Sequence, residues 1–333
     1  MHPKISIIIP CYNLGEYLDG CLLSIQKQPH TQEVEYIFIN DGSTDNTLLK
    51  LQNFCKERSN CIFINQPNKG VSTARNNALG QVRGDYIYLL DGDDKLTENA
   101  IKKMLSSISD SPDLVLSQHY EEDKNITHKV GLTIKNGKYG LIELLKNKSY
   151  FPISTKILYK RSILTAHDTH FNPNLTLGEV FEFTCRALIH STTIKVIPDS
   201  FFVYVRRDEG SATRSVNYSR DLSITKTIES YNIILGELFE EPLLQSTILK
   251  ILMSFTYNKY AKLCLWDNDL RYTLSNVRQN VTVRNLLKKS TKNKNLTNKD
   301  RFLAGYFLYT GISGYRLLIK IMQLIKKFKN KAI

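Results

Sequence analysis

The chain has 333 residues, 42% of them hydrophobic and 23% charged, which is an ordinary composition for a globular protein. It contains no uninterrupted apolar run of about 18 residues, so we expect no membrane-spanning helix. Its six cysteines form no C-x-x-C pair and no zinc-finger spacing, which favours a reducing, cytoplasmic compartment. The net charge of +13 is uneven, because residues 271–333 hold 15 Lys or Arg against one acid, Asp300.

The first 110 residues alternate between two patterns. Short apolar runs rich in Ile, Tyr and Phe predict buried parallel strands at 5–10, 35–40, 61–66 and 85–90. The stretches between and after them predict helices over roughly 15–27, 45–57, 71–82 and 97–108. Asp45 is expected to cap the second helix and Thr97 the fourth. Because strand–helix–strand repetition implies right-handed crossovers, this part of the chain is predicted to form a doubly wound α/β sheet.

The remainder of the chain is less regular. It predicts a strand at 113–120, a hairpin at 126–140 that turns at Asn136-Gly137, a strand and helix at 154–164, a helix at 178–191, and a paired strand at 194–207. From about residue 217 the pattern is helical, with a Lys- and Asn-rich loop expected at 288–300.

Polar or turn-forming residues follow each of the first four predicted strands. They are Pro10-Cys11-Tyr12-Asn13, Asp41-Gly42-Ser43, Pro67-Asn68-Lys69-Gly70 and Asp91-Gly92-Asp93-Asp94. Ligands of doubly wound sheets bind outside the carboxyl ends of the strands. The sequence therefore predicts that these four segments form one site.

Three aspartates within four positions, Asp91, Asp93 and Asp94, repel one another unless a cation lies among them. Carboxylates at i and i+2 after a strand can converge on Mg²⁺ or Mn²⁺, which share their coordination shell with substrate phosphates. The alternative is an Asp- and Gly-rich turn that only caps the next helix. The position at the end of a buried strand favours the metal.

The neighbouring segments suit a nucleotide. Asp41 can accept hydrogen bonds from a base edge, and Pro10 and Tyr12 offer a flat apolar wall for that base. Lys69 and Arg75 lie on a glycine-containing turn and the helix after it, where cations and free N–H groups suit an anion. The chain contains no G-x-x-x-x-G-K-[ST], and no G-x-G-x-x-G follows the first strand, which argues against a P-loop enzyme and against dinucleotide binding.

Four segments in order carry a resemblance to a known family: "SIIIPCYNLGEYLDGCLLSI", "EYIFINDGSTDNT", "NKGVSTARNNAL" and "GDYIYLLDGDDKL". Together they resemble the inverting glycosyltransferases of family 2, of the polysaccharide-biosynthesis type. The match covers about residues 4–110 and continues more weakly to about 215. It implies an A-type glycosyltransferase fold, which is a Rossmann-like α/β nucleotide-diphospho-sugar transferase fold, with a C-terminal helical extension.

The resemblance also implies a division of labour along the chain. Residues 1–215 would be the catalytic domain, with a nucleotide-sugar donor half at 1–110 and an acceptor half at 111–215. Residues 216–333 would be a helical, basic extension.

The family's roles carry over onto matching positions. Pro10, Tyr12 and Asp41 would hold the base, usually uracil, while Arg75 and Asp91 would contact the base–ribose region. The metal would be Mn²⁺ or Mg²⁺ bridging the diphosphate.

The metal ligands implied by the resemblance come from the aspartate-rich turn. Asp93 would bind the ion, with Asp91 as the other candidate ligand. Asp94 would either be a further ligand or a structural cap, and the cap is preferred.

The chain departs from the family at the catalytic base. Family members carry "GED" at the start of a helix, and here Val180 stands in place of the Asp. Glu179 could serve as the base from the neighbouring position, or Glu182 from one helical turn further on. The third alternative is an attenuated or non-catalytic nucleotide-sugar-binding protein that lacks the base. Glu179 is preferred, and a solvated helix carboxylate is an equally good interpretation of Glu182.

Two basic segments remain. Arg206 lies in a segment similar to one that closes over the diphosphate in the family, and an exposed basic loop is the alternative. The segment 314–333 places apolar residues on one helical stripe with lysines off it, which favours a helix on an anionic membrane surface. Packing on the catalytic domain is the alternative. No nucleic-acid-binding module is present in the sequence.

The sequence therefore predicts a metal-dependent enzyme of the hexosyltransferase type, cytoplasmic and peripheral on the inner face of the cell membrane. It would move a sugar from a nucleotide sugar, most simply a UDP-sugar, to a glycan or lipid-linked glycan with inversion, in surface polysaccharide biosynthesis.

Overall fold

The computed structural model describes residues 2–29, 32–121, 126–128, 157–175, 178–205 and 281–292, and the single positions 294, 296, 298, 301, 302, 305 and 309. The chain divides into two compact units, Met1–Ser215 and Val216–Ile333. The predicted turn at Asn136-Gly137, Arg206 and the basic segment 314–333 lie outside the described residues.

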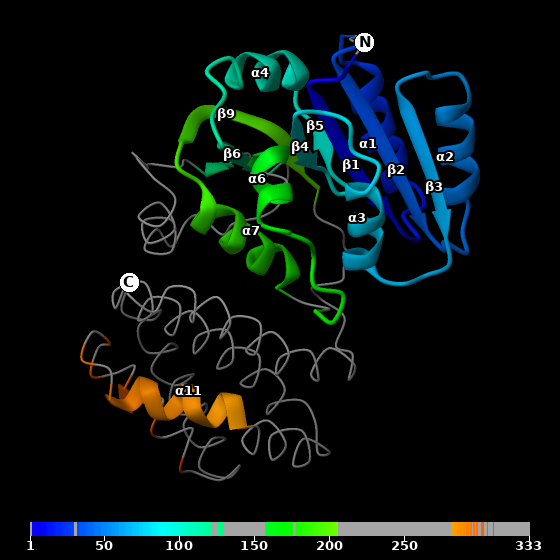
Figure 1. The fold of residues 1–333 in the computed structure, drawn as a ribbon. Coiled ribbons are helices and arrows are strands. Elements are labelled where there is room, and N and C mark those ends of the chain that lie inside the picture. Colours follow the sequence, from blue (N-terminus) through cyan, green and yellow to red (C-terminus); the bar gives the residue numbers. More distant parts are fainter. Residues whose placement is uncertain are drawn as a thin grey trace, which may run out of the picture. The chain divides into compact units, whose positions relative to one another are not determined.

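The first unit is built on a nine-stranded sheet (Figure 1). Strands β1 (Ile5–Cys11), β2 (Val34–Asp41), β3 (Cys61–Gln66) and β4 (Tyr86–Leu89) run parallel in the order β3-β2-β1-β4. These are the four predicted strands, each within one residue of its predicted ends. Their carboxyl ends meet at one edge of the sheet, as the predicted site requires.

Beyond β4 the sheet becomes mixed. Strand β8 (Ile157–Lys160) runs antiparallel between β4 and β6 (Leu114–Glu121). Strand β9 (Ile194–Tyr204) lies parallel to β6. The short strand β5 (Lys95–Leu96) pairs with β9, and the short strand β7 (Ile126–His128) pairs with β6. The doubly wound prediction therefore describes only the first half of the sheet. Residue periodicity does not say which earlier strand a later one joins, so the insertion of β8 was not predicted.

Among its described residues, the first unit contains helices α1 (Tyr17–Gln26), α2 (Thr47–Lys56), α3 (Val71–Leu79), α4 (Ala100–Ser107), α6 (Arg161–Ala166) and α7 (Glu179–His190). The N-cap of α2 is Asn46, one residue after the predicted Asp45, and the Asp45 Oδ1 accepts the Thr47 N–H at 3.0 Å at the start of this helix. The Thr97 prediction is wrong. The Thr97 hydroxyl donates to the Ser200 carbonyl at 2.6 Å, and this bond joins the loop before α4 to β9.

In the second unit, α11 (Val281–Lys292) is described. It continues through the first five residues of the loop predicted at 288–300. Lysine is a good helix former, so a Lys-rich composition alone did not mark a helix end.

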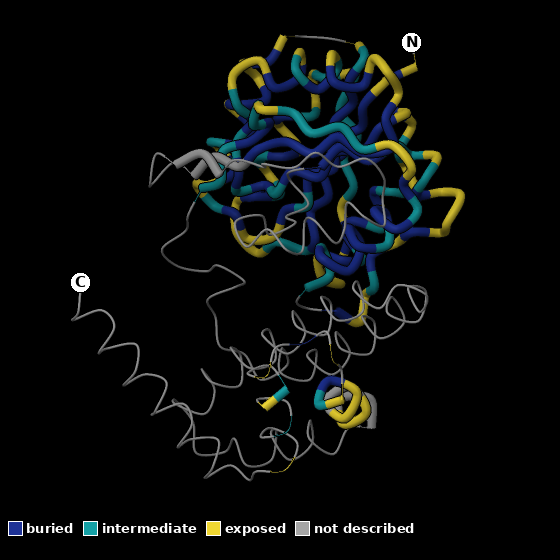
Figure 2. The backbone as a smooth tube through the Cα atoms, turned by 90° about the vertical axis from the view of Figure 1, so that its left-hand side faces the viewer, coloured by how far each residue is buried: buried dark blue, intermediate teal, exposed yellow. Residues whose placement is uncertain are grey.

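The core lies against both faces of the parallel strands. Ile5, Ile7 and Ile9 of β1 belong to one buried cluster with residues of α1, α2 and α4. Side chains alternate along a strand, so Ile8 of the same strand faces the other way. Helix α3 contacts β1 and β2 and contributes nothing to that cluster, which places α3 on the opposite face. Figure 2 shows the buried strands enclosed by more exposed helix surfaces and loops.

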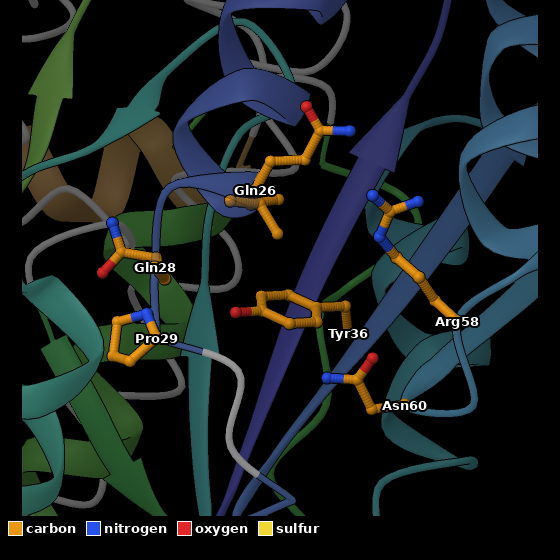
Figure 3. A pocket seen from close by; sticks show the side chains of 7 residues that line it. Gln26, Gln28, Pro29, Tyr36, Arg58 and Asn60 are labelled. Atoms are coloured by element: carbon orange, nitrogen blue, oxygen red, sulfur yellow. The ribbon is translucent and has the colours of Figure 1, made fainter.

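A shallow hollow lies at the amino edge of the sheet (Figure 3). It is lined by Ile25, Gln26, Gln28, Pro29, Tyr36, Arg58 and Asn60. The Arg58 guanidinium already donates to the Phe54 carbonyl and lies 3.9 Å from the centre of the Phe54 ring. The hollow is at the edge opposite to the one where parallel sheets bind ligands.

Within the described part of the chain, no helix is long and apolar enough to cross a bilayer.

Candidate active site

The loops after β1 and β2 are joined to each other. The Asn13 side-chain oxygen accepts the Thr44 N–H at 2.8 Å, and the Asn13 N–H donates to the Ser43 hydroxyl at 3.1 Å. Asn13 has a φ of 46°, a left-handed conformation that asparagine tolerates better than most residues. Next to it Tyr12 is 47% exposed and Pro10 is partly buried, and both lie at the carboxyl end of β1.

Asp41, at the end of β2, organises the segment that leads into α3. Its carboxylate is buried and accepts hydrogen bonds from the Gln66 side chain at 2.7 Å and from the Lys69 and Gly70 N–H groups at 2.9 Å each. Gly70 precedes α3 with a φ of 85°. Asp41 thus lies at the predicted edge with its oxygens already engaged by the protein, and the Lys69 side chain is exposed above it.

The aspartate-rich turn after β4 packs directly on the end of β1. A Cβ at Gly92 would lie 2.5 Å from Leu14 Cδ1 and 3.1 Å from the Pro10 carbonyl oxygen, so a larger residue here would force the Leu14 side chain to move. The close approach brings the turn that carries Asp91 and Asp93 against Pro10 and Leu14. Both aspartates are partly exposed.

Asp94 behaves differently from its two neighbours. It is 2% exposed, and its Oδ1 accepts the Val205 N–H at 3.0 Å. This bond ties the turn to the end of β9. The preference for a structural role over a metal ligand fits this geometry, although Asp94 anchors a strand end and does not cap a helix.

Arg75, on α3, joins two carboxylates that are far apart in the sequence. Its Nη2 donates to Asp91 Oδ1 at 2.8 Å and its Nη1 to Glu179 Oε1 at 3.2 Å. The Arg75 side chain is 4% exposed, Glu179 is 14% exposed and Asp91 is 35% exposed. Burial by itself lowers the pKa of Arg75, but the two carboxylates outweigh burial and raise it, so the guanidinium stays charged.

Glu179 is the first residue of α7 and follows Gly178, whose φ is 80°. Glu182, one turn further, is 4% exposed and hydrogen-bonds to Arg186 at 2.9 Å on the same helix. The interpretation of Glu182 as a solvated carboxylate is therefore wrong. Glu179 is the acidic residue of this helix start that reaches the edge of the sheet, and Val180 beside it is partly exposed.

Cys11, at the end of β1, is buried beneath this edge. Burial is the largest cause that raises the pKa of its thiol well above the usual value. The thiol is therefore neutral at physiological pH and is no candidate nucleophile.

A divalent ion suits the residues at this edge. Mg²⁺ and Mn²⁺ are commonly held by one or two carboxylates together with substrate phosphates and water. Asp91 and Asp93 offer that donor set at a partly exposed turn. Among the residues that the structure describes, no group of three or more His, Cys, Asp or Glu could hold a metal ion.

The structure brings together the predicted Pro10, Tyr12, Asp41, Lys69, Arg75, Asp91, Asp93 and Glu179 at the carboxyl edge. Sequence reasoning missed the link between Arg75 and Glu179 and the ring of Phe171, whose centre lies 5.2 Å from the Arg75 guanidinium. These residues are about a hundred positions apart, so no local pattern could reveal the contact.

Comparison with known proteins gives a consistent result. The family model described as "Glycosyl transferase family 2" matches residues 6–167. The "Glycosyltransferase GlyG" of Streptococcus pneumoniae is 29% identical over 240 residues, which cover 67% of this chain and 78% of that protein. The chain spans less of several other curated relatives, 24% in one and 64% in another.

Two solved structures support the fold. The crystal structure of S. aureus TarS 1–349 in complex with UDP-GlcNAc matches with a TM-score of 0.71 at 20% identity, over 96% of this chain and 92% of that one. The mannosyltransferase PcManGT from Pyrobaculum calidifontis, in complex with GDP-Man and Mn²⁺, matches with a TM-score of 0.51 at 13% identity, over 99% and 88%. The fold is therefore that of the A-type glycosyltransferases.

Proposed function

The chain belongs to glycosyl transferase family 2 and is a glycosyltransferase, and on that premise we propose that it transfers a sugar from a UDP-sugar to a glycan or lipid-linked glycan in surface polymer synthesis. The observation that carries the proposal is the meeting of Asp91 and Glu179 on one buried arginine at the carboxyl edge of the sheet. It supports a site in which Asp91 would serve the donor and Glu179 the acceptor. Similarity to a TarS structure determined with UDP-GlcNAc supports a UDP-sugar donor.

The donor would bind across the ends of β1, β2 and β4. Tyr12 and Pro10 offer the surface for the base. The segment that Asp41 holds in place through the Lys69 and Gly70 N–H groups carries the exposed Lys69 side chain, whose positive charge suits the phosphates. Asp93, with Asp91 beside it, would hold Mn²⁺ or Mg²⁺. When bound, such an ion stabilises the charge that develops on the departing nucleoside diphosphate.

Glu179 is the proposed general base. An inverting transfer needs a group that takes the proton from the acceptor hydroxyl as its oxygen forms the bond to the anomeric carbon. Glu179 carries a carboxylate at the edge of the site, whereas Val180 cannot accept a proton and Glu182 is buried against Arg186. The proton would pass to Glu179, and the sugar–phosphate bond would break on the opposite face of the sugar.

Membrane contact is proposed from the sequence alone. The segment 314–333 combines an apolar stripe with lysines, and residues 271–333 concentrate the positive charge of the chain. Such a segment suits the anionic inner face of a cell membrane, where a lipid-linked acceptor would lie. Flotation of the full-length protein with anionic vesicles, compared with a variant truncated before Gly314, tests this directly. Equal flotation of the two would refute it.

The function itself is tested by UDP release. We expect the protein with Mn²⁺ to bind UDP and to release UDP from UDP-GlcNAc or from another UDP-sugar of a panel. EDTA and Asp93→Ala should each abolish the release. Asp199→Ala is a matched control, because this exposed aspartate pairs with Lys103 away from the site.

Two results would point elsewhere. UDP binding without release from any UDP-sugar would identify the protein as a nucleotide-sugar binder that lacks a working base, the alternative suggested by Val180. Absence of UDP binding with either metal would reject the proposed donor class.

A further inference from the structure

We propose that Arg75 is a positioning residue that holds Asp91 and Glu179 in one hydrogen-bonded unit and does not itself touch the nucleotide sugar. Arg75 would thereby couple the donor side of the site to the acceptor side. The inference rests on the proposed function, because it takes Glu179 to be the general base.

The pattern of exposure is the first argument. The Arg75 side chain is 4% exposed, whereas Asp91 is 35% and Glu179 is 14% exposed. A ligand that approaches from solvent therefore meets the two carboxylates before it meets the guanidinium. The family resemblance implied contact between Arg75 and the base–ribose region, and the burial of Arg75 argues against that role.

The hydrogen bonds of the guanidinium are the second argument. Each terminal nitrogen serves a different carboxylate, Nη2 for Asp91 and Nη1 for Glu179. The Nε atom is buried and has no hydrogen-bond partner among the residues that the structure describes. An arginine selected only for packing would be expected to satisfy Nε, since an unmade bond of a buried donor is costly. The orientation instead favours reaching both carboxylates at once.

The third argument is the framework beneath the guanidinium. Asn76, the next residue on α3, donates to the Phe171 carbonyl at 2.7 Å and accepts the Phe171 N–H at 2.8 Å. The Phe171 ring lies 5.2 Å from the Arg75 guanidinium and stacks on Phe183 of α7 at 4.1 Å. Helix α3 therefore holds Phe171, which precedes α7 in the chain. It also carries Arg75, whose guanidinium donates to Glu179, the first residue of α7.

Arginine suits this task better than lysine. Its planar fork presents two nitrogens to two acceptors in fixed directions, whereas a lysine ammonium is a single point charge on a flexible stem. Substitution by lysine keeps the positive charge but cannot hold both carboxylates in the same geometry. A misplaced general base slows the chemical step, and a displacement of about 1 Å can cost about a hundredfold in rate.

The test is Arg75→Lys in the full-length protein with Mn²⁺. We measure the dissociation constant of UDP by calorimetry, and UDP release from saturating UDP-GlcNAc with water as acceptor. We expect UDP affinity within about threefold of wild type and a fall in the release rate of about tenfold to a hundredfold. Binding of UDP also reports that the variant is folded.

Two further variants make the test independent of how Arg75→Lys folds. Glu179→Asp keeps a proton acceptor but withdraws it from Arg75 by one methylene, so it should lose rate to a similar extent with unchanged UDP affinity. Because the two residues act as one unit, the double variant Arg75→Lys/Glu179→Asp should be no more than about threefold slower than the slower single variant. Arg83→Lys is the matched control, since Arg83 pairs with Glu35 at the other edge of the sheet.

The opposite results overturn the inference. A loss of UDP affinity of tenfold or more in Arg75→Lys, with the rate at saturation retained, would mean that Arg75 contacts the donor. A wild-type rate in Glu179→Asp, or multiplying rate losses in the double variant, would mean that the link between Arg75 and Glu179 has no catalytic role. Either result is distinguishable from failure of the proposed function, in which the wild-type protein itself neither binds UDP nor releases it.

Discussion

Two arginine–carboxylate clusters lie at opposite edges of the same sheet, and they differ in which partner is buried. At the amino edge, the Glu35 side chain is 2% exposed and its partner Arg83 is 58% exposed. At the carboxyl edge the order is reversed, because Arg75 is 4% exposed and its partner Asp91 is 35% exposed. The two clusters use the same residue types for different purposes.

The hydrogen bonds explain the difference. Glu35 accepts hydrogen bonds from the Ser6 hydroxyl, from the Arg83 backbone and side chain, and from the Gly84 N–H, so its carboxylate is fully used inside the protein. Asp91 and Glu179 each use one carboxylate oxygen to accept a hydrogen bond from Arg75, and both side chains remain partly exposed. A buried carboxylate with an exposed arginine is built for stability, whereas a buried arginine leaves its carboxylates available to a ligand.

The largest expected effect is at the carboxyl edge. Asp93→Asn should lower UDP release from UDP-sugar by about a thousandfold, because a metal ligand contributes several kcal/mol to stabilising the leaving group. The melting temperature without ligand should change little, since Asp93 is partly exposed. Initial rates with varied Mn²⁺ and differential scanning fluorimetry measure the two quantities.

Asp94→Asn is the control for Asp93→Asn. An asparagine oxygen can still accept the Val205 N–H, so this variant should lose less than about tenfold in rate. An equal loss in the two variants would mean that Asp94 also serves the metal or the donor, and would remove the distinction drawn within this turn.

The next largest effect is expected at the amino edge. A Cβ at Gly84 would lie 2.6 Å from the Ser6 nitrogen and 2.7 Å from the Ile5 carbonyl carbon, both of them backbone atoms of β1. Gly84→Ala should therefore destabilise the protein by about 3 kcal/mol through overpacking, with UDP affinity retained in the folded fraction. Urea unfolding measures the loss.

Gly80→Ala provides the matched comparison for Gly84→Ala. A Cβ there meets its nearest atom, the Asn77 carbonyl oxygen, at 3.5 Å, which is ordinary contact. The free energy of unfolding should stay within about 0.5 kcal/mol of wild type. Similar losses in both variants would contradict the idea that the amino edge is tightly closed.

A smaller effect, dependent on pH, is expected for Glu35→Gln. Burial alone raises the pKa of Glu35, but hydrogen bonds from Ser6 and Arg83 outweigh it and hold the pKa below its usual range. A depressed pKa stabilises the fold above the unfolded-state pKa of about 4.3, and that stabilisation is lost as the pH falls through the folded-state pKa. Glu35→Gln should cost about 2 kcal/mol at pH 7.

The measurement for Glu35→Gln is urea unfolding of both proteins between pH 3 and pH 7. The difference in unfolding free energy should narrow as the pH falls below about 4.3. A difference that stayed constant with pH would show that Glu35 stabilises the fold through its shape and not through its charge.

The sequence predicted the parallel half of the sheet well because β1, β2 and β4 are buried almost throughout, while β3 at the end of the strand order is partly exposed. A continuous apolar run that ends in turn residues is typical of buried strands, and 5–10 has that pattern. The candidate site followed from the same feature. Carboxyl ends of parallel strands share an edge, so the polar residues after them had to lie near one another.

The predictions that failed depend on tertiary contacts. Thr97 bonds to Ser200 of β9, and Glu182 is buried against Arg186. A helix-capping pattern or an apparently exposed acid is judged from its neighbours in sequence, whereas these contacts join residues distant in the chain or depend on burial. The link between Arg75 and Glu179 is of the same kind, which is why the most informative feature of the site came from the structure.

The smallest expected effect is at Cys11, which lies beneath the carboxyl edge yet belongs to the buried core. It is 1% exposed, and burial raises the pKa of its thiol well above the usual value, so it is neither a nucleophile nor a metal ligand at neutral pH. Cys11→Ala should retain UDP release within about threefold and lose about 1 kcal/mol of stability, since it removes one buried sulfur from a packed site.

In the folded wild-type protein, iodoacetamide should leave Cys11 unmodified while the partly exposed Cys55 reacts, as mass spectrometry of the digested protein can report. Rapid modification of Cys11 that UDP prevents would contradict this assignment. The Cys11 thiol would then lie in the open part of the site and not in the buried core.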